Sequence, residues 1–406
     1  MSLQSKWYFK CIACEWEEEI SAGDPPGFRC KKCNDLLQLV LKDAYPSRKE
    51  LFENGNAISV WKYERALPAR KKVSLGEGGT PLIKSLNLSR ELELENLYVK
   101  FEGLNPTGSF KDRGMTVAVA RAIDTGARVL VCASTGNTSA SLAAYSARAA
   151  MKAVVIVPEG KVAKGKLIQA VVYGARIVKV EGSFDAALDM VTRVVVKERK
   201  YYLMNSINPF RIEGQKTIAY EVFEQLGRVP DYVVLPVGNA GNISAVWKGF
   251  KELKEWGITD KLPAMIGVQA EGAAPIAEAL QKGFDQPRVW KEPETAASAI
   301  RIGNPVSWKK AMRAIKESDG FAVTVSDSEI LESRSKLASR EGIFVEAASA
   351  SPVAALRKLT ERIGQDADVV CIATGNGLKD QELVVWSPEN VETVTNAEML
   401  ADILSD

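Results

Sequence analysis

The sequence NPTGSFKDRG occupies residues 105–114 and places Lys111 directly after a turn that contains proline and glycine. An Ala- and Val-rich stretch follows, and we expect a helix over residues 115–122. A lysine near the start of a helix feels the positive end of the helix dipole, which favours its neutral, nucleophilic form. A lone lysine at such a place is usually a solvated surface residue, so its interpretation depends on the rest of the chain.

Short apolar runs on both sides of this motif alternate with Ala-rich or glycine-bearing helical stretches. That order predicts an α/β fold with parallel sheets built from βαβ units, and two α/β lobes are the economical arrangement. Strands are expected at residues 129–133, 153–157, 177–180, 201–204, 232–236, 265–269 and 369–373.

The composition limits the kind of partner. The chain has 406 residues, enough for two or three domains, and its 53 basic residues nearly balance its 51 acidic residues. This balance gives no electrostatic reason for nucleic acid or a membrane surface as a partner, so the ligand is expected to be a small molecule. The chain lacks a run of roughly 18 apolar residues and the order of a signal peptide, so we expect a cytoplasmic protein.

Histidine is absent from the sequence. Its absence excludes Ser-His-Asp and Cys-His nucleophile pairs and most catalytic zinc sites. Proton transfer must therefore use lysine, a carboxylate, tyrosine, cysteine or a cofactor.

Four of the six cysteines form two C-x2-C pairs separated by fifteen residues. This spacing is typical of zinc knuckles, although vestigial or disulfide-paired knuckles remain an alternative. Asn34 follows the second pair and tolerates the positive φ wanted there, whereas Glu15 after the first pair is less suited to it. The candidate metal ligands are Cys11, Cys14, Cys30 and Cys33.

Three more loops follow predicted strands. ASTGNTSA at 133–140 opens an Ala-rich helix, whose exposed N–H groups suit a carboxylate. In PVGNAGNI at 236–243, glycine lets backbone amides converge on an anion. ATGNGLKD at 373–380 follows the last predicted strand. Each loop alone would be an ordinary turn or helix cap.

Together, these segments resemble the motifs of fold-type II pyridoxal-phosphate enzymes, which include threonine synthases, threonine dehydratases and cysteine synthases. The resemblance implies two parallel-sheet lobes of the tryptophan synthase β type, pyridoxal 5'-phosphate as cofactor and Lys111 as its catalytic Schiff-base lysine. It also implies that Asn137 contacts the 3' oxygen and that the Thr374 hydroxyl faces the ring nitrogen. The full implied cofactor-binding set is Lys111, Phe110, Asn137, Gly238, Asn239, Ala240, Gly241, Asn242 and Thr374.

Within that family, NSINPFRIEGQKT at 205–217 resembles a threonine synthase motif, as do the segments at 76–82 and 299–308. The resemblance runs from about 73 to 379, and it departs at 346–350, where EAASA replaces the common E-P-A-S-A. The resemblance implies that protein hydroxyl groups bind the substrate carboxylate. It also implies that an arginine, whose guanidinium is planar and charged, binds the substrate phosphate. The implied substrate-binding residues are Ser134, Thr135, Thr138, Asn205, Ser206 and Arg211.

The resemblance implies conversion of O-phospho-L-homoserine and water to L-threonine and phosphate. A cysteate synthase acting on phosphoserine and sulfite, a lyase like threonine dehydratase, and a binding module without catalysis stay open as alternatives. The implied organisation is a zinc-ribbon-like segment at 1–42, a large cofactor-binding lobe at 43–112 and 206–406, and a small mobile lobe at 113–205. A homodimer is expected.

Overall fold

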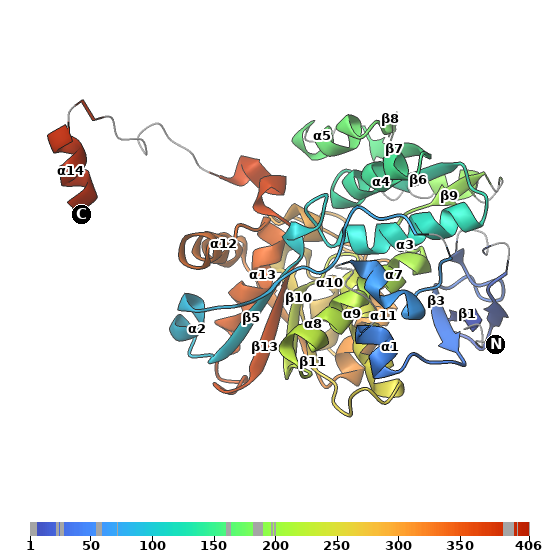
Figure 1. Ribbon diagram of the computed structural model, residues 1–406, viewed down its shortest axis with the longest axis horizontal. Helices are drawn as coiled ribbons and strands as arrows, with labels where there is room; N and C mark the ends of the chain where they lie inside the picture. Colours follow the sequence, from blue (N-terminus) through green and yellow to red (C-terminus); the bar gives the residue numbers. More distant parts are fainter. Residues whose placement is uncertain are drawn as a thin grey trace.

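The computed structural model describes residues 6–21, 24, 28–53, 59–70, 72–159, 164–181, 190–195, 198, 200–384, 394–395 and 397–405. These residues form an N-terminal antiparallel sheet and two α/β lobes (Figure 1). Within the described ranges, no helix is long and apolar enough to cross a membrane.

The larger lobe is built on a six-stranded sheet with the order β12-β11-β10-β13-β5-β4. Its strands pair in parallel except for the edge strand β4, which is antiparallel to β5. The strands are β4 (Leu82–Lys84), β5 (Asn96–Phe101), β10 (Tyr232–Pro236), β11 (Ala264–Ala270), β12 (Phe321–Val325) and β13 (Asp368–Ala373). The α-helices of this lobe are α2 (Asn87–Glu91), α8 (Thr217–Leu226), α9 (Gly241–Glu255), α10 (Pro275–Gln281), α11 (Trp308–Glu317), α12 (Asp327–Glu341) and α13 (Ala347–Leu356). Short 3-10 helices are η3 (Glu102–Leu104), η4 (Glu271–Ala273), η5 (Ser298–Ile300) and η6 (Gly377–Leu383).

The smaller lobe contains a four-stranded parallel sheet with the order β8-β7-β6-β9. The strands are β6 (Val129–Ala133), β7 (Lys152–Pro158), β8 (Arg176–Val180) and β9 (Tyr201–Leu203). The helices around it are α3 (Lys111–Asp124), α4 (Asn137–Arg148) and α5 (Lys164–Val172), and α7 (Pro209–Gln215) packs against α3. The two sheets confirm the predicted α/β architecture, whereas the proposed lobe boundaries stay a prediction.

The N-terminal sheet has the order β2-β1-β3 and consists of β1 (Lys6–Cys11), β2 (Glu17–Glu19) and β3 (Leu37–Lys42). Alternate residues of β1 and β3 are buried, as expected for an antiparallel sheet with one face on the protein body. We call residues 6–42 the ribbon. The helices α1 (Arg48–Phe52) and η2 (Val60–Ala66) follow it, and α14 (Ala397–Ser405) ends the described chain.

All seven predicted strands are present, with ends that differ by at most one residue. The other strands, β1 to β5 and β12, lie outside the predicted strand ranges. The helix expected at 115–122 is longer, because α3 begins at Lys111 itself. The helix after the 236–243 loop begins at Gly241.

Candidate active site

Lys111 lies where two loops of the larger lobe meet. The turn before it is hydrogen-bonded to the loop after β13: Phe110 N donates to Thr374 O at 3.0 Å, and Asn376 N donates to Gly108 O at 2.9 Å. Gly108 has a φ of +82°, in the left-handed region that favours glycine. The structure therefore brings together the lysine motif and the 373–380 loop, which are far apart in sequence.

The surroundings of Lys111 favour its neutral amine. The side chain stays partly exposed, yet burial of the amino group lowers its pKa to about 7. Nearby Arg211 lowers this pKa further, and Glu346 opposes the shift. Its Nζ lies 4.0 Å from the centre of the Phe110 ring. An amine that is partly neutral at neutral pH is suited to forming an imine.

Glu346 lies opposite, directly before α13, and is almost completely buried. Asn137 Nδ2, at the start of α4, donates to its two carboxylate oxygens at 3.1 and 3.0 Å. Burial raises the pKa of Glu346 to about 7, and the nearby Asp380 carboxylate adds to the effect. This contact joins the two lobes beside Lys111. The sequence analysis gave Glu346 no role, although the 346–350 segment was part of the resemblance.

Thr374 is held by a residue that the sequence analysis did not select. Its Oγ1 lies 2.8 Å from Ser349 Oγ, and Ser349 Oγ also accepts a hydrogen bond of 2.8 Å from Gly375 N. A Cβ at Gly375 would lie 2.4 Å from Glu346 Oε1, so a side chain there would displace the Glu346 carboxylate. The buried Thr374 hydroxyl is therefore fixed in orientation by α13.

The 236–243 loop has the features of an anion cradle. Ala240 has a φ of +65° and ends the loop where α9 begins at Gly241. A Cβ at Gly238 would lie 3.1 Å from Ala299 O, which leaves little room for a side chain. The Asn242 amide is buried, and both its oxygen and its nitrogen lack a hydrogen-bond partner among the described residues. Because unpaired buried amides are costly, this loop fits a bound phosphate.

The 133–140 loop presents hydroxyl groups at the N-terminus of α4. Ser134, Thr135 and Thr138 are partly exposed, whereas Ser139 is buried and donates to Gly136 O at 2.7 Å. The loop thus leaves the predicted hydroxyl groups accessible near Asn137. Backbone N–H groups at such a helix start favour a carboxylate.

Arg211 is a buried arginine in α7. Its Nη1 donates to Met204 O at 3.0 Å, and its Nε has no hydrogen-bond partner in the described part of the chain. Burial lowers the pKa of this guanidinium to about 10. A buried guanidinium without a paired carboxylate is costly unless an anion joins it, so Arg211 fits the predicted phosphate site.

Asn205 and Ser206, the other two residues predicted to bind the substrate phosphate, differ in how far their side chains are already hydrogen-bonded. The Asn205 side chain makes two hydrogen bonds to the backbone of Ala133. Its Oδ1 accepts from Ala133 N at 2.9 Å, and its Nδ2 donates to Ala133 O at 2.8 Å. An amide nitrogen carries two protons, so a second donor remains for a ligand. Ser206 is partly exposed. Their contact with a phosphate stays a prediction.

The helices that carry Lys111 and Arg211 touch at their backbones. Gly114 of α3 faces α7 so closely that a Cβ there would lie 2.6 Å from Arg211 O. Close backbone contact of this kind fixes the distance between two helices, because no side chain lies between them to adjust. The geometry therefore couples the position of Arg211 to that of Lys111.

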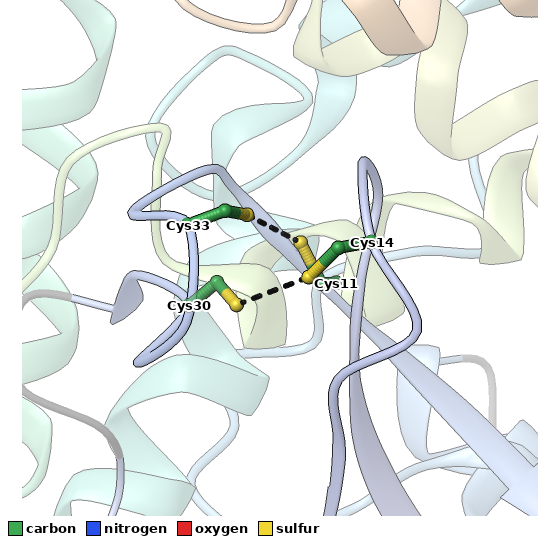
Figure 2. Close-up of side chains that lie close together, drawn as sticks. All are labelled: Cys11, Cys14, Cys30 and Cys33. Atoms are coloured by element: carbon green, nitrogen blue, oxygen red, sulfur yellow. Dashed lines mark hydrogen bonds between the residues drawn. The ribbon is translucent and has the colours of Figure 1, made fainter.

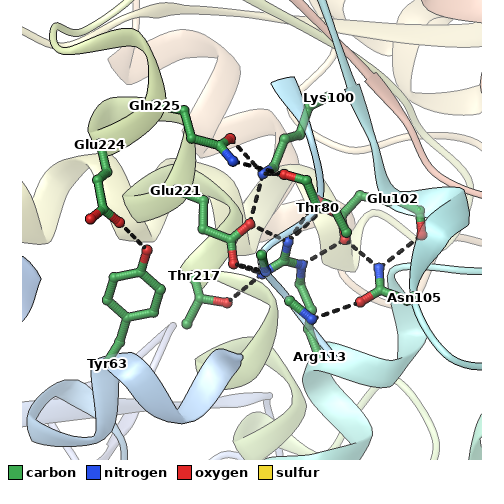
Figure 3. A network of polar contacts seen from close by, with 12 residues as sticks. Tyr63, Thr80, Lys100, Glu102, Asn105, Arg113, Thr217, Glu221, Glu224 and Gln225 are labelled. Carbon is green, nitrogen blue, oxygen red and sulfur yellow. Dashed lines mark hydrogen bonds and ion pairs between the residues drawn. The ribbon is translucent and has the colours of Figure 1, made fainter. Parts of the chain in front are cut away.

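A buried charge network fixes α3 from its other side (Figure 3). Arg113, fully buried, donates to Glu102 at 2.6 and 2.7 Å and to Glu221 at 2.6 Å from each of two nitrogens. Lys100 also donates to Glu221, at 2.7 Å. Two acidic and two basic side chains thus tie the first turn of α3 to β5, η3 and α8. This network was not predicted.

The four cysteines of the ribbon form a compact cluster (Figure 2). Their sulfur atoms all lie within 4.8 Å of one another, with Cys11 and Cys33 at 3.4 Å and Cys14 and Cys30 at 3.7 Å. Zinc–sulfur bonds of about 2.3 Å in a tetrahedron would place the sulfurs about 3.8 Å apart. All six cysteines are free, so the disulfide-paired alternative is not observed.

The knuckle backbones also suit thiolates. Ala13 N and Lys32 N each point to a cysteine sulfur at 3.4 Å. Asn34 has a φ of +60°, as expected, and Glu15 does not adopt a positive φ. Glu15 therefore avoids the left-handed conformation to which it is less suited.

Comparison with known proteins identifies the chemistry that this site resembles. Residues 73–375 match the family described as pyridoxal-phosphate dependent enzyme. The chain is 53% identical over 391 residues to a threonine synthase of Methanocaldococcus jannaschii, covering 94% of this chain and 95% of that one. It is 51% identical over 385 residues to a threonine synthase of Methanosarcina acetivorans, covering 93% and 94%.

Solved structures show the same fold. A threonine deaminase from T.th. matches with a TM-score of 0.62 and 28% identity, covering 76% of this chain and 94% of that one. A maize serine racemase matches with a TM-score of 0.64 over 80% of this chain and 91% of that one, at 19% identity, so it supports the fold alone.

Proposed function

The chain belongs to the pyridoxal-phosphate dependent enzymes, and within them to the threonine synthases, and on that basis we propose that it converts O-phospho-L-homoserine and water to L-threonine and phosphate. The observation that carries the proposal is Arg211, a buried guanidinium near Lys111 that has no carboxylate partner among the residues that the structure describes. A phosphorylated substrate supplies the missing anion. A dehydratase acting on free threonine would not.

The residues present fit the cofactor. Lys111 would hold it through an imine, the 238–242 loop would bind its phosphate, and Phe110, Asn137 and Thr374 would surround its ring. When bound, pyridoxal phosphate supplies an electron sink for negative charge that develops on the substrate carbons. Thr374, held by Ser349, would offer a neutral hydroxyl to the ring nitrogen, and this would leave that nitrogen less firmly protonated than a carboxylate would.

The remaining side chains bind and orient the substrate. Ser134, Thr135 and Thr138 would hold its carboxylate at the start of α4, and Arg211, Asn205 and Ser206 would hold its phosphate. Holding both ends fixes the substrate carbons beside Lys111, which makes reaction far more probable than in solution.

Lys111 is the group that we assign to proton transfer. The chain has no histidine, and the pKa of the Lys111 amine is lowered to about 7, near the value that serves both proton uptake and release. It would move protons at Cα and Cβ of the substrate. The contact between Asn137 and Glu346 joins the lobes beside it and would help to exclude water.

A substrate comparison tests the proposed function. Purified holoenzyme is supplied in parallel with O-phospho-L-homoserine, with O-phosphoserine plus sulfite, and with L-threonine, and phosphate, amino-acid products and oxoacid are measured. Equal amounts of phosphate and threonine from the first substrate are expected. Turnover with phosphoserine plus sulfite alone would favour a cysteate synthase, and deamination of threonine alone would favour a dehydratase. A protein that binds cofactor but turns over none of them would favour a binding module.

We also propose that the four ribbon cysteines hold a structural zinc ion. A closed set of four thiolates at tetrahedral spacing is typical of structural rather than catalytic zinc. Elemental analysis of protein prepared without chelators is expected to give one zinc per chain, and a value near zero would contradict the site.

The lobe division at 43–112 and 206–406 against 113–205, a homodimeric assembly and a cytoplasmic location belong to the same proposal. The separation of the two sheets supports the lobe division, and the resemblance supports the homodimer and the location. Light scattering on purified protein tests the assembly.

A further inference from the structure

The ribbon packs directly on the helix that carries Arg211. Phe210, the residue before Arg211, is fully buried, and its ring centre lies 5.8 Å from that of Phe9 and 6.4 Å from that of Phe28. Both contacts are edge-to-face, an arrangement that stabilises aromatic pairs. β3 also contacts α7, and Figure 1 shows the ribbon beside this helix.

One of these rings is tied to the cysteine cluster by sequence. Phe28 precedes the ligand Cys30 by two residues and has a φ of +57°, a strained conformation for a side chain of this size. Such strain persists only where the surroundings enforce it. Four cysteines bound to one metal ion would hold this segment, and with it the Phe28 ring, against Phe210.

The ribbon also binds the smaller lobe. Arg121 of α3 donates to Asp24 at 2.6 Å and to Ser21 O at 2.8 Å, and the same guanidinium lies 5.2 Å from the Phe210 ring centre. Tyr202 OH donates to Asp24 at 2.6 Å. The helix of Lys111 therefore reaches the ribbon through Arg121.

The larger lobe supplies cationic donors to ribbon carbonyls. Lys310 donates to Leu37 O at 2.8 Å and Lys248 to Leu39 O at 2.6 Å. Arg313 donates to the carbonyl of Ile12, next to Cys11, at 3.1 Å. These three hydrogen bonds join the ribbon to α9 and α11 of the larger lobe.

We propose that the metal-bound ribbon positions Arg211 through Phe210 and thereby sets the affinity of the substrate phosphate site. The inference rests on the proposed role of Arg211 in phosphate binding. α7 is held between α3, which it meets at Gly114, and the ribbon, so loosening the ribbon frees the side of α7 that faces it. The 236–243 and 373–380 loops lie on other elements, so we expect cofactor binding to be retained.

The test compares inorganic phosphate binding to holoenzyme variants by titration calorimetry. Cys33→Ser removes one ligand at an exposed position, and Phe210→Leu keeps all four cysteines while removing the ring contacts. We expect both to bind phosphate roughly tenfold more weakly, about the effect of losing one charge-assisted hydrogen bond, with the cofactor's visible absorption band retained. Phe223→Leu is the matched control, because its ring contacts Phe52 rather than the ribbon, and wild-type affinity is expected.

The outcomes separate the parts of the proposal. Wild-type phosphate affinity in metal-free, folded Cys33→Ser would overturn the role of the metal, and wild-type affinity in Phe210→Leu would overturn the coupling through the ring. If Cys33→Ser does not fold, Phe210→Leu with its zinc content measured decides the coupling alone. A wild-type enzyme that binds phosphate but does not release it from O-phospho-L-homoserine would refute the proposed function without deciding the coupling.

Discussion

Gly214 of α7 lies against Arg113 of α3 so closely that a Cβ at residue 214 would be 1.8 Å from Arg113 O. With the reciprocal approach of Gly114 to Arg211, the two helices meet backbone to backbone. The amine of Lys111 and the guanidinium of Arg211 are therefore carried by a single rigid pair of helices. This rigidity suits an enzyme that must hold a leaving phosphate at a fixed distance from its proton-transfer group.

Replacing Gly214 by alanine is expected to destabilise the protein by about 1 to 3 kcal/mol or more, because overpacking here must push the two backbones apart. Urea unfolding measures the change. Gly364→Ala is the control, since Gly364 is exposed and its nearest neighbour would be the Asp366 side chain at 3.1 Å. Equal stability of the Gly214→Ala and Gly364→Ala variants would show that the helices do not meet as described.

Arg211→Ala is expected to lower kcat/KM for O-phospho-L-homoserine by roughly tenfold to a few hundredfold, because charge-assisted hydrogen bonds to phosphate contribute about 1.5 to 3 kcal/mol each. The visible band of the cofactor should survive. Arg211→Lys should recover only part of the loss, since it restores the charge without the planar fork. Unchanged kinetics in Arg211→Ala with a normal spectrum would place the phosphate site elsewhere.

Arg113→Met is expected to cost about 3 to 5 kcal/mol of folding stability, because it leaves Glu102 and Glu221 buried with only part of their compensating charge. Chemical denaturation followed by circular dichroism measures this loss. Lys31→Ala breaks an exposed ion pair with Glu18 and should change stability by less than about 1 kcal/mol. Similar small effects for both variants would mean that the buried network contributes little.

Reconstitution of the apoenzyme with pyridoxal phosphate should depend on pH through Lys111. A lysine with its pKa lowered to about 7 is protonated below that pH and neutral above it, so the rate of imine formation should rise through pH 7 and then level off. An ordinary lysine would give a rate that rises to about pH 10.4. Glu346 raises the pKa of Lys111, so Glu346→Gln should move the rise to lower pH. A wild-type rate still climbing above pH 9 would contradict a perturbed amine.

Much of the site could be predicted from sequence because its loops follow strands. The 133–140, 236–243 and 373–380 loops each leave the carboxyl end of a parallel strand, and the predicted strands fixed these positions. Such ends gather at one edge of a sheet. The phosphate loop could be singled out for this reason, whereas Lys111 was assigned through the resemblance of its motif.

The contacts between loops could not be predicted. Asn137 meets Glu346 and Thr374 meets Ser349 only after the chain folds, and nothing local in either segment specifies the partner. The bounds of β5 were not predicted, since Lys100 interrupts its apolar run. That lysine is buried because Glu221, on α8, compensates its charge.

Two lysines have a lowered pKa, and the central claim is that Lys111, not Lys310, carries the cofactor. Lys111 and Lys310 both have pKa values lowered to about 7 by burial of the amino group, but Lys310 lies in the first turn of α11 and donates to the ribbon at Leu37 O. Borohydride reduction of the holoenzyme, followed by proteolysis and mass spectrometry, shows which lysine carries the cofactor. The structure predicts a pyridoxyl group on the peptide that contains Lys111. A pyridoxyl group on Lys310 or any other lysine, with Lys111 unmodified, would contradict the assignment.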